Sequence, residues 1–177
     1  MKVPNKLKEI NGDDVILRLI QPEDASRFME IFRADPEIQK SVTWTSGLDS
    51  EEKIREKIQG FKDSKSLRYS IIKEERIVGY IGLWKYQGYF GNAPEPGEYG
   101  IGYLCDLNAR GQGVIKQAIT ALKTRAESIL PIEFYSLYIH DDNIASQKIV
   151  ESLGGYRTEE VFEEPALECF ERRWILN

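Results

Sequence analysis

The sequence predicts an α/β fold built on one mixed sheet, and three features of the chain support this. Three strand-like runs follow one another in the middle of the chain, as in a meander of adjacent strands. Two units follow in which a strand leads into a helix, so the sheet is mixed and not doubly wound. The length of 177 residues suits one domain, which is expected to span residues 1–177.

The N-terminal part is expected to contribute one strand and two helices. Residues 15–20 are typical of a strand, and Pro22 suits the first turn of a helix. The apolar residues of that helix recur three and four positions apart: Ala25, Phe28, Met29 and Phe32. Residues 34–47 show no period and are predicted to form a loop. Asp49 or Ser50 can then cap the second helix.

The middle of the chain is expected to form three strands, over residues 67–73, 77–86 and 98–106. Glu74 and Glu75 can make a tight turn between the first two, and the prolines and glycines of residues 87–97 predict a loop. The third strand alternates. One face carries Tyr99, Ile101, Tyr103 and Cys105, and the other carries Glu98, Gly100, Gly102 and Leu104.

The C-terminal part is expected to hold two more helices and three strands. The first helix places one apolar stripe at Ile115, Ala118, Ile119, Leu122, Ala126 and Ile129. A strand over residues 134–140 follows, and Asp142 or Asn143 can cap the next helix. Strands near residues 157–162 and 168–175 close the chain. The prediction is therefore about seven strands with four helices.

The joint between the strand at residues 98–106 and the next helix carries Arg110, Gly111 and Gly113. Such a joint leaves backbone N–H groups unpaired at the positive end of a helix, and glycine lets a ligand approach the backbone. This predicts a site for a phosphate or pyrophosphate. The spacing matches neither a Walker loop nor a Rossmann fingerprint. An ordinary glycine-rich turn is the alternative.

Composition limits the partners. The net charge is −5, so indiscriminate binding to nucleic acid or to an anionic membrane is not expected. Cys105 and Cys169 have no metal-ligand or redox spacing, so we expect free thiols and no metal. No long apolar window and no apolar secretory segment is present, so the cytoplasm is the predicted location. Monomer and homodimer are both left open.

Two segments resemble the GNAT acetyltransferase superfamily. Arg110-x-x-Gly113-x-Ile115 is similar to its acetyl-CoA loop, Q/R-x-x-G-x-G/A, and departs from that pattern at Ile115. A bulky aliphatic there is familiar in the Rim-type branch, the ribosomal-protein amino-terminal acetyltransferases. The preceding Ile101-Gly102-Tyr103 resembles the I-G-Y of that branch in the same register. The stretch from Asn143 to Ser146 resembles the N-x-x-S of the family.

The resemblance implies a GNAT-like acyl-CoA N-acyltransferase fold, with central strands splayed around the cofactor. The co-substrate would be acetyl-CoA, and the reaction would be direct acetyl transfer to a primary amine in a ternary complex. That amine could belong to a protein N-terminus or to a small molecule. By the same resemblance the cofactor would contact Tyr103, Leu104, Cys105, Arg110, Gly111, Gln112, Gly113, Val114, Ile115, Asn143 and Ser146.

The resemblance also implies catalytic roles. Ser146 would donate to the departing CoA thiolate, although its hydroxyl could instead bond within its own helix or help cap it. Rim-type relatives often carry a Glu directly before I-G-Y, where this chain has Gly100. Glu98 could replace that base, directly or through water, or it could be a solvated carboxylate at the sheet edge. Trp44 could line the amine pocket or simply pack.

Two other functions remain open. The domain could be a catalytically silent acyl-CoA sensor or regulatory domain, which the missing Glu at Gly100 would favour. It could also be a nucleotide-binding module that uses the glycine turn for another pyrophosphate. His140 is expected to be structural or at the surface, and Arg172-Arg173 is expected to form a solvated basic edge beside a core Trp174.

Overall fold

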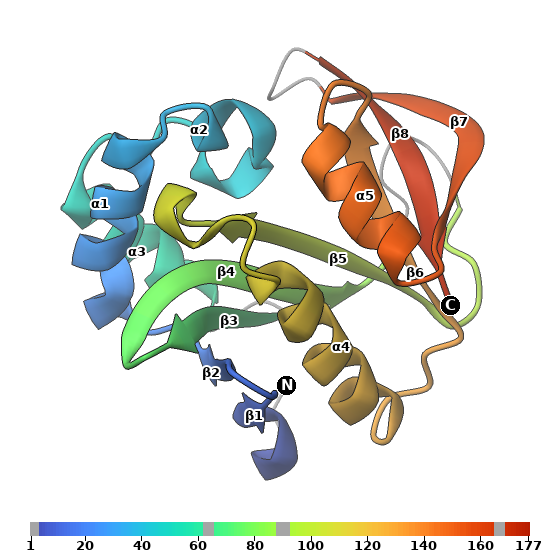
Figure 1. Cartoon of the computed structure of the whole chain (residues 1–177), viewed down its shortest axis with the longest axis horizontal. Helices are drawn as coiled ribbons and strands as arrows, with labels where there is room; N and C mark the ends of the chain where they lie inside the picture. Colours follow the sequence, from blue (N-terminus) through green and yellow to red (C-terminus); the bar gives the residue numbers. More distant parts are fainter. Residues whose placement is uncertain (1–3, 62–65, 88–92, 165–168) are drawn as a thin grey trace.

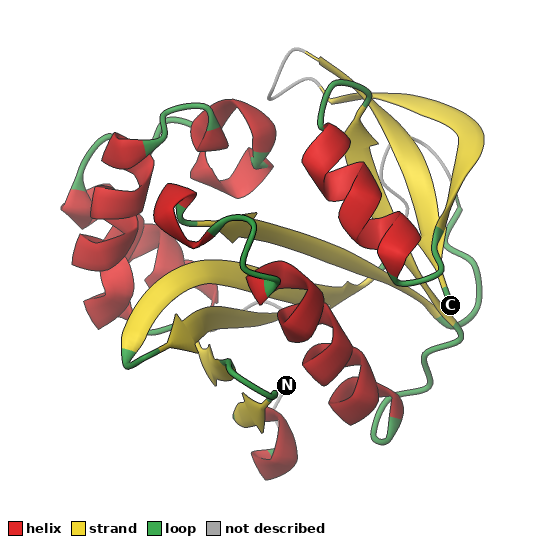
Figure 2. Cartoon of the chain, in the orientation of Figure 1, coloured by secondary structure: helices red, strands yellow, loops and turns green. Residues whose placement is uncertain are grey.

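The computed structural model describes residues 4–61, 66–87, 93–164 and 169–177, and it contains one sheet with helices on both faces (Figures 1 and 2). The strand order is β1-β2-β3-β4-β5-β6-β8-β7. Neighbouring strands are antiparallel except β5 and β6, which are parallel, so the predicted mixed sheet is confirmed. The strands are β1 Glu9–Asn11, β2 Ile16–Leu19, β3 Ser66–Lys73, β4 Arg76–Lys85, β5 Glu98–Cys105, β6 Phe134–His140, β7 Tyr156–Glu164 and β8 Cys169–Leu176.

All seven predicted strands are present, and β1 is additional. It escaped prediction because three residues with one buried side chain, Ile10, leave no alternation to detect. The predicted tight turn between β3 and β4 is confirmed, since Glu74 and Glu75 both have positive φ angles, of 50° and 61°. Residues 88–92 of the loop predicted at residues 87–97 lie outside the described residues, and the described remainder, Gln87 and residues 93–97, contains no helix or strand, as predicted.

The four predicted helices are also present: α1 Ala25–Ala34, α3 Glu51–Gly60, α4 Val114–Glu127 and α5 Ile144–Ser152. The prediction of a loop at residues 34–47 is wrong in part, because α2 (Ile38–Ser41) and the 3₁₀ turn Thr43–Thr45 lie there. A single helical turn gives no periodic signal. Its Ile38 is buried, and the Thr45 hydroxyl donates to the Val42 carbonyl at 2.8 Å.

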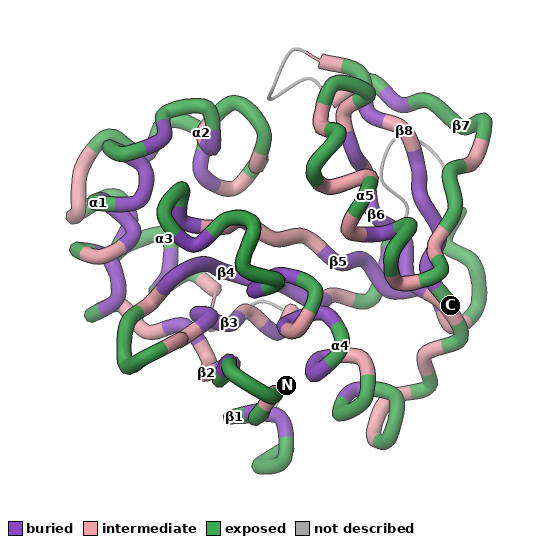
Figure 3. The backbone as a smooth tube through the Cα atoms, viewed as in Figure 1, coloured by how far each residue is buried: buried purple, intermediate pink, exposed green. Residues whose placement is uncertain are grey.

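Two hydrophobic cores lie on opposite faces of the sheet. The buried residues are concentrated along the central strands and the helix sides that face them (Figure 3). α4 and α5 cover the face that carries Tyr99 and Ile101 of β5, whereas α1 and α3 cover the face that carries Leu104. The alternation predicted for this strand is therefore confirmed. We call the first face the α4/α5 face and the second the α1/α3 face.

The two central strands diverge. β5 pairs with β6 only at its first three residues, Glu98 to Gly100 against Phe134 to Ser136. The rest of β5 pairs with β4 alone, up to Cys105 against Gly79. The edge of β5 from Ile101 onward therefore faces a gap, in which backbone groups can pair with an extended ligand.

Candidate active site

The glycine turn ends β5 and starts α4. Gly111 and Gly113 have φ angles of 74° and 72°, which favour glycine, and Gly113 is the N-cap of α4 without any side-chain cap. Among the described residues, no acceptor receives the N–H groups between Gly111 and Lys116. The 14-residue helix directs its positive end at the same place. The turn has the features of an anion site.

The side chains of the turn divide into two groups. Val114 and Ile115 are 2% and 5% exposed and pack in the core, so only their backbone can meet a ligand. Arg110 lies at the surface, pairs with the carboxylate of Asp35 and reaches the carbonyl of Cys105 at 3.4 Å. This arrangement fixes the turn against the C-terminal end of α1.

A hollow of about 210 Å³ adjoins the turn. Lys73, Arg76, Asn108 and Gln112 line it, together with Glu74, Val78, Asp106 and Ala109. Asp106 is paired with Arg27, so its charge is compensated. The cations Lys73 and Arg76 lie on the β3–β4 hairpin, far from the motif in sequence, which is why the motif did not indicate them.

The open edge of β5 presents Tyr103, Leu104 and Cys105 toward the gap. Leu104 is 4% exposed on the α1/α3 face, and burial raises the pKa of the Cys105 thiol to about 11. That thiol is therefore neutral and is not a prepared nucleophile. What this strand offers to a ligand is its backbone.

Helix α5 brings Asn143 and Ser146 to the same face as the glycine turn. Asn143 is the N-cap, and its side-chain oxygen accepts from the Ser146 N–H at 3.1 Å. The Ser146 hydroxyl makes no hydrogen bond to its own helix. It approaches the buried phenol of Tyr103, whose oxygen has no partner of good geometry among the described residues. Burial raises the pKa of Tyr103 to about 12, and Ser146 opposes this effect. The hydroxyl of Ser146 is thus available to a ligand.

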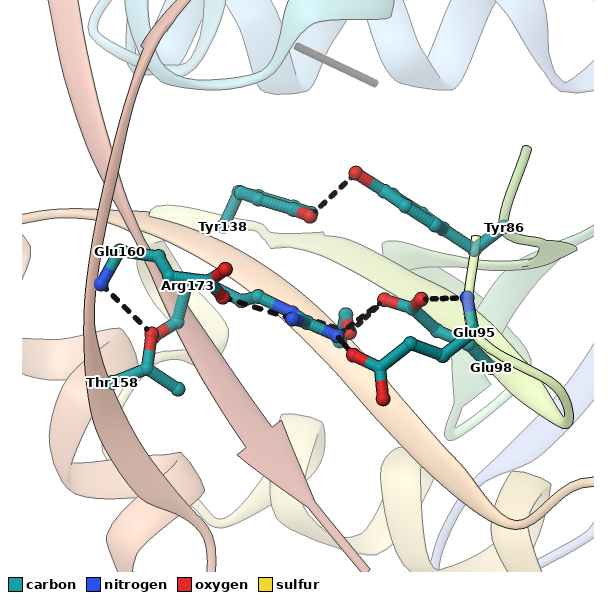
Figure 4. Close-up of polar contacts among 8 residues, drawn as sticks. Tyr86, Glu95, Glu98, Tyr138, Thr158, Glu160 and Arg173 are labelled. Atoms are coloured by element: carbon teal, nitrogen blue, oxygen red, sulfur yellow. Dashed lines mark hydrogen bonds and ion pairs between the residues drawn. The ribbon is translucent and has the colours of Figure 1, made fainter. Parts of the chain in front are cut away.

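Glu98 is not a solvated edge carboxylate, because only 1% of it is exposed. Figure 4 shows its carboxylate beside the Arg173 guanidinium and Glu95. Its carboxylate accepts from the Arg173 guanidinium at 2.8 Å, from the Ser136 hydroxyl and from the Glu95 N–H at 3.1 Å. Three donors occupy its lone pairs, which leaves it poorly placed to accept a proton from a substrate.

Arg173 itself corrects the expectation of a solvated basic edge. The residue is 8% exposed, and Glu95 and Glu160 complete its ion pairs at 3.0 and 2.8 Å. These charges raise the pKa of Arg173 above its ordinary value. The cluster holds together the ends of β5, β6 and β8 where the gap begins. Trp174 is 3% exposed in the core, as expected.

Trp84 explains why Gly100 carries no carboxylate. The two residues are direct cross-strand partners, and a Cβ placed on Gly100 would overlap the indole of Trp84. The space in which the resemblance to the Rim-type branch would place a Glu side chain is therefore filled by an aromatic ring from β4. A base must come from elsewhere.

Trp44 packs against four aromatic rings. Its centroid lies 4.9 Å from that of Tyr80, 5.5 Å from Phe61, and about as close to Phe28 and Phe32. Trp44 thus packs in this aromatic cluster and is only partly exposed, and its role in an amine pocket stays a prediction. His140 is half-buried and close to Asp142, as expected of a histidine near the surface.

The outer strands add residues that sequence reasoning did not select. Tyr86 stacks with Tyr138 at 6.0 Å and their hydroxyls lie 2.7 Å apart (Figure 4). Phe162 packs edge-on against Tyr138 at 5.3 Å. Glu171 lies on the same face, 9% exposed. Alternation along β6 and β8 could have placed Tyr138 and Glu171 on one face, but no local pattern brings Tyr86 and Phe162 next to Tyr138.

The model of the acetyltransferase (GNAT) domain family matches residues 14–155. The chain belongs to this family. Its fold and its enzyme class, an acetyltransferase, are therefore confirmed. A ribosomal-protein-serine acetyltransferase of Escherichia coli (strain K12) is 30% identical over 89 residues, which cover 48% of this chain. The matched region spans less than half, 46%, of that relative.

Solved structures agree on the fold. A ribosomal L7/L12 alpha-N-protein acetyltransferase, RimL, in complex with coenzyme A has a TM-score of 0.78 at 20% identity, over 94% of this chain and 96% of that one. The acetyltransferase AAC(6')-Ib in complex with ribostamycin and coenzyme A has a TM-score of 0.77 at 16% identity, over 93% and 94%. Within the described residues, no helix is long and apolar enough to cross a membrane. The cytoplasmic location stays a prediction.

Proposed function

We propose that this acetyltransferase moves the acetyl group of acetyl-CoA directly to a primary amine of a protein N-terminus or a small molecule. The observation that carries this proposal is the alignment, on one face, of the uncapped start of α4, the open edge of β5 and the Ser146 hydroxyl. An extended thioester needs these three features: an anion site, a strand partner and a hydrogen-bond donor near its sulfur.

The pyrophosphate would bind the N–H groups between Gly111 and Ile115. Lys73 and Arg76 would supply positive charge in the adjoining hollow, and Arg110 would hold the turn. The pantetheine arm would pair with the backbone of Tyr103 to Cys105, where an N–H can polarise the thioester carbonyl. Asn143 would orient the first turn of α5 so that Ser146 can donate to the thiolate.

The amine would arrive from the α1/α3 face. This face carries several carboxylates near the gap, including Glu160 and Glu164, and the aromatic group Tyr86, Tyr138 and Phe162. Acidic and aromatic groups together favour a protonated amine. Trp44 would pack behind the amine pocket and hold its wall in place through contacts with the neighbouring aromatic rings.

Calorimetric titration tests the donor site. Acetyl-CoA and CoA should bind, and ATP should bind far more weakly. The Gly113→Glu variant should lose acetyl-CoA binding through clash and like charge. Gly47→Glu is the matched control, since Gly47 has the same positive φ of 72° at an exposed position and should retain binding. Lack of any CoA binding at millimolar concentration would refute the proposal.

A silent acyl-CoA sensor is the second candidate. Two observations favour it: Trp84 fills the site of the usual base, and Glu98 is bound by three donors. Thiol release from acetyl-CoA separates the two functions, with a polyamine, an aminoglycoside, an amino-acid amide and a peptide with N-terminal serine as acceptors. Binding of acetyl-CoA without turnover of any amine would establish the sensor.

A further inference from the structure

Glu171 is a buried carboxylate to which the described part of the chain offers no hydrogen-bond donor and no ion-pair partner. It is 9% exposed, and among the described residues none donates a hydrogen bond to it. Burial raises its pKa to about 7, and the negative charge of Glu164 adds to this effect. A carboxylate in such surroundings can exchange a proton near neutral pH, as a general base requires.

The groups around Glu171 come from three strands. β6 places His140 directly opposite, β7 places Phe162 opposite with Glu164 nearby, and β8 itself adds Arg173 two positions along. Arg173 is already bound by Glu95, Glu98 and Glu160, so its charge is compensated. Among residues 4–61, 66–87, 93–164 and 169–177, no cation is therefore committed to Glu171.

Glu171 lies at the end of the sheet toward which the gap between β5 and β6 opens. Its partner His140 is the last residue of β6, and α5 with Ser146 begins four residues later. Glu171 and Ser146 therefore lie at the same end of the sheet on opposite faces. A thioester held on the α4/α5 face would meet an amine arriving from the face of Glu171.

From this geometry, and resting on the acetyl transfer proposed above, we infer that Glu171 is the general base that accepts the proton of the attacking amine. The assignment gives the site the base that Gly100 and the fully bonded Glu98 do not provide. Glu98 and Glu171 are both buried on the α1/α3 face. Of these two, only Glu171 lacks bound donors among the described residues and can accept a proton.

The proposed reaction consists of a proton transfer from the ammonium group followed by transfer of the acetyl group. The Glu171 carboxylate takes one proton from the ammonium group and passes it to solvent. The nitrogen lone pair then forms the C–N bond, and the C–S bond breaks with its electrons on sulfur. The nitrogen loses its second proton, and the thiolate gains one with Ser146 as hydrogen-bond donor. The products are the amide and CoA thiol.

The experiment is a pH profile of kcat/KM, from about pH 5.5 to about 9.5, for the full chain and for Glu171→Gln. The acceptor is the fastest amine of the panel above, and a second amine of different pKa separates its own titration from that of the enzyme. The unmodified chain should lose activity below about pH 7. Glu171→Gln should lower kcat/KM about 100- to 10,000-fold near neutral pH, with a deficit that shrinks as the amine deprotonates in solution.

Two further variants serve as a control and as a conservative replacement. Glu163→Gln removes the same charge from an exposed position on the same hairpin and should leave the profile unchanged. Glu171→Asp should keep the acidic limb at reduced rate. Acetyl-CoA affinity should stay within about threefold in all variants, which shows that the fold is intact.

Three outcomes overturn the assignment. An unaltered acidic limb in Glu171→Gln would mean that another group titrates. A loss of equal size at every pH would mean a structural role only. Absence of turnover by the unmodified chain would refute both the proposed function and this base, whereas turnover with an unaltered limb refutes the base alone.

Discussion

The raised pKa of Glu171 predicts how the free energy of unfolding changes with pH, independently of any role in catalysis. Its pKa is raised from 4.5 to about 7, mainly by burial. The folded protein therefore holds this proton more tightly than the unfolded chain does. The resulting stabilisation is fully present below about pH 4.5 and is lost as the pH rises through about 7. Replacing Glu171 with Gln should remove this pH dependence.

The magnitude follows from the two pKa values. The difference between 4.5 and about 7 corresponds to about 3 kcal/mol over the full titration. Between pH 5 and pH 8 the expected part is about 2–3 kcal/mol, because the unfolded carboxyl is already partly ionised at pH 5. The free energy of unfolding of Glu171→Gln relative to the unmodified chain should rise by that amount over this interval.

Urea unfolding of both proteins at several pH values measures this quantity. Taking the difference between the proteins cancels the titration of all other carboxylates to first order. Glu163→Gln serves as the control, and its difference from the unmodified chain should stay flat with pH. A flat difference for Glu171→Gln as well would refute the view that Glu171 is buried without compensation.

Three other substitutions test the role of Ser146, the buried phenol of Tyr103 and the ion cluster around Arg173. Ser146→Ala should lower kcat about 10- to 1,000-fold with little change in acetyl-CoA affinity, whereas Ser152→Ala, on the same helix, should not; equal kcat for both would remove Ser146 from the chemistry. Tyr103→Phe should be neutral or up to about 1 kcal/mol more stable in urea, because it removes a buried hydroxyl without a partner; clear destabilisation would reveal a bond to Ser146. Arg173→Met should cost about 3–5 kcal/mol because it leaves Glu98 buried without its cation, while Arg172→Met, which breaks a pair with the exposed carboxylate of Asp141, should change stability much less; similar effects would contradict the ion cluster.

Much of the fold and donor site was predictable from sequence because the signals are local. The glycines at Gly111 and Gly113 adopt the positive φ that their spacing suggested, and Asn143 caps α5 as its position predicted. Alternation in β5 correctly assigned Leu104 to one face and Tyr103 to the other. Each inference needed only a few consecutive residues.

The acceptor side was harder to predict because it depends on register between strands. Gly100 is visible in the sequence as a missing carboxylate, but only its pairing with Trp84 shows why a larger residue does not fit there. Likewise, Arg173 looks like a solvated cation until the pairing of β6 with β8 brings it beneath Glu98. Such pairings join residues 16 and 75 positions apart, which no local pattern encodes.

The contrast between Glu98 and Glu171 bears on how this face can work. Both carboxylates are buried on one side of the sheet, yet Glu98 has an arginine, a hydroxyl and an N–H, while Glu171 has none among the described residues. A bonded carboxylate fixes structure; an unbonded one destabilises the fold at neutral pH and is expected where a proton must be exchanged. If Glu171→Gln raises stability at pH 8 while lowering kcat/KM, the same burial explains both effects. A variant that gains stability and keeps its rate would instead leave the destabilising carboxylate without a function.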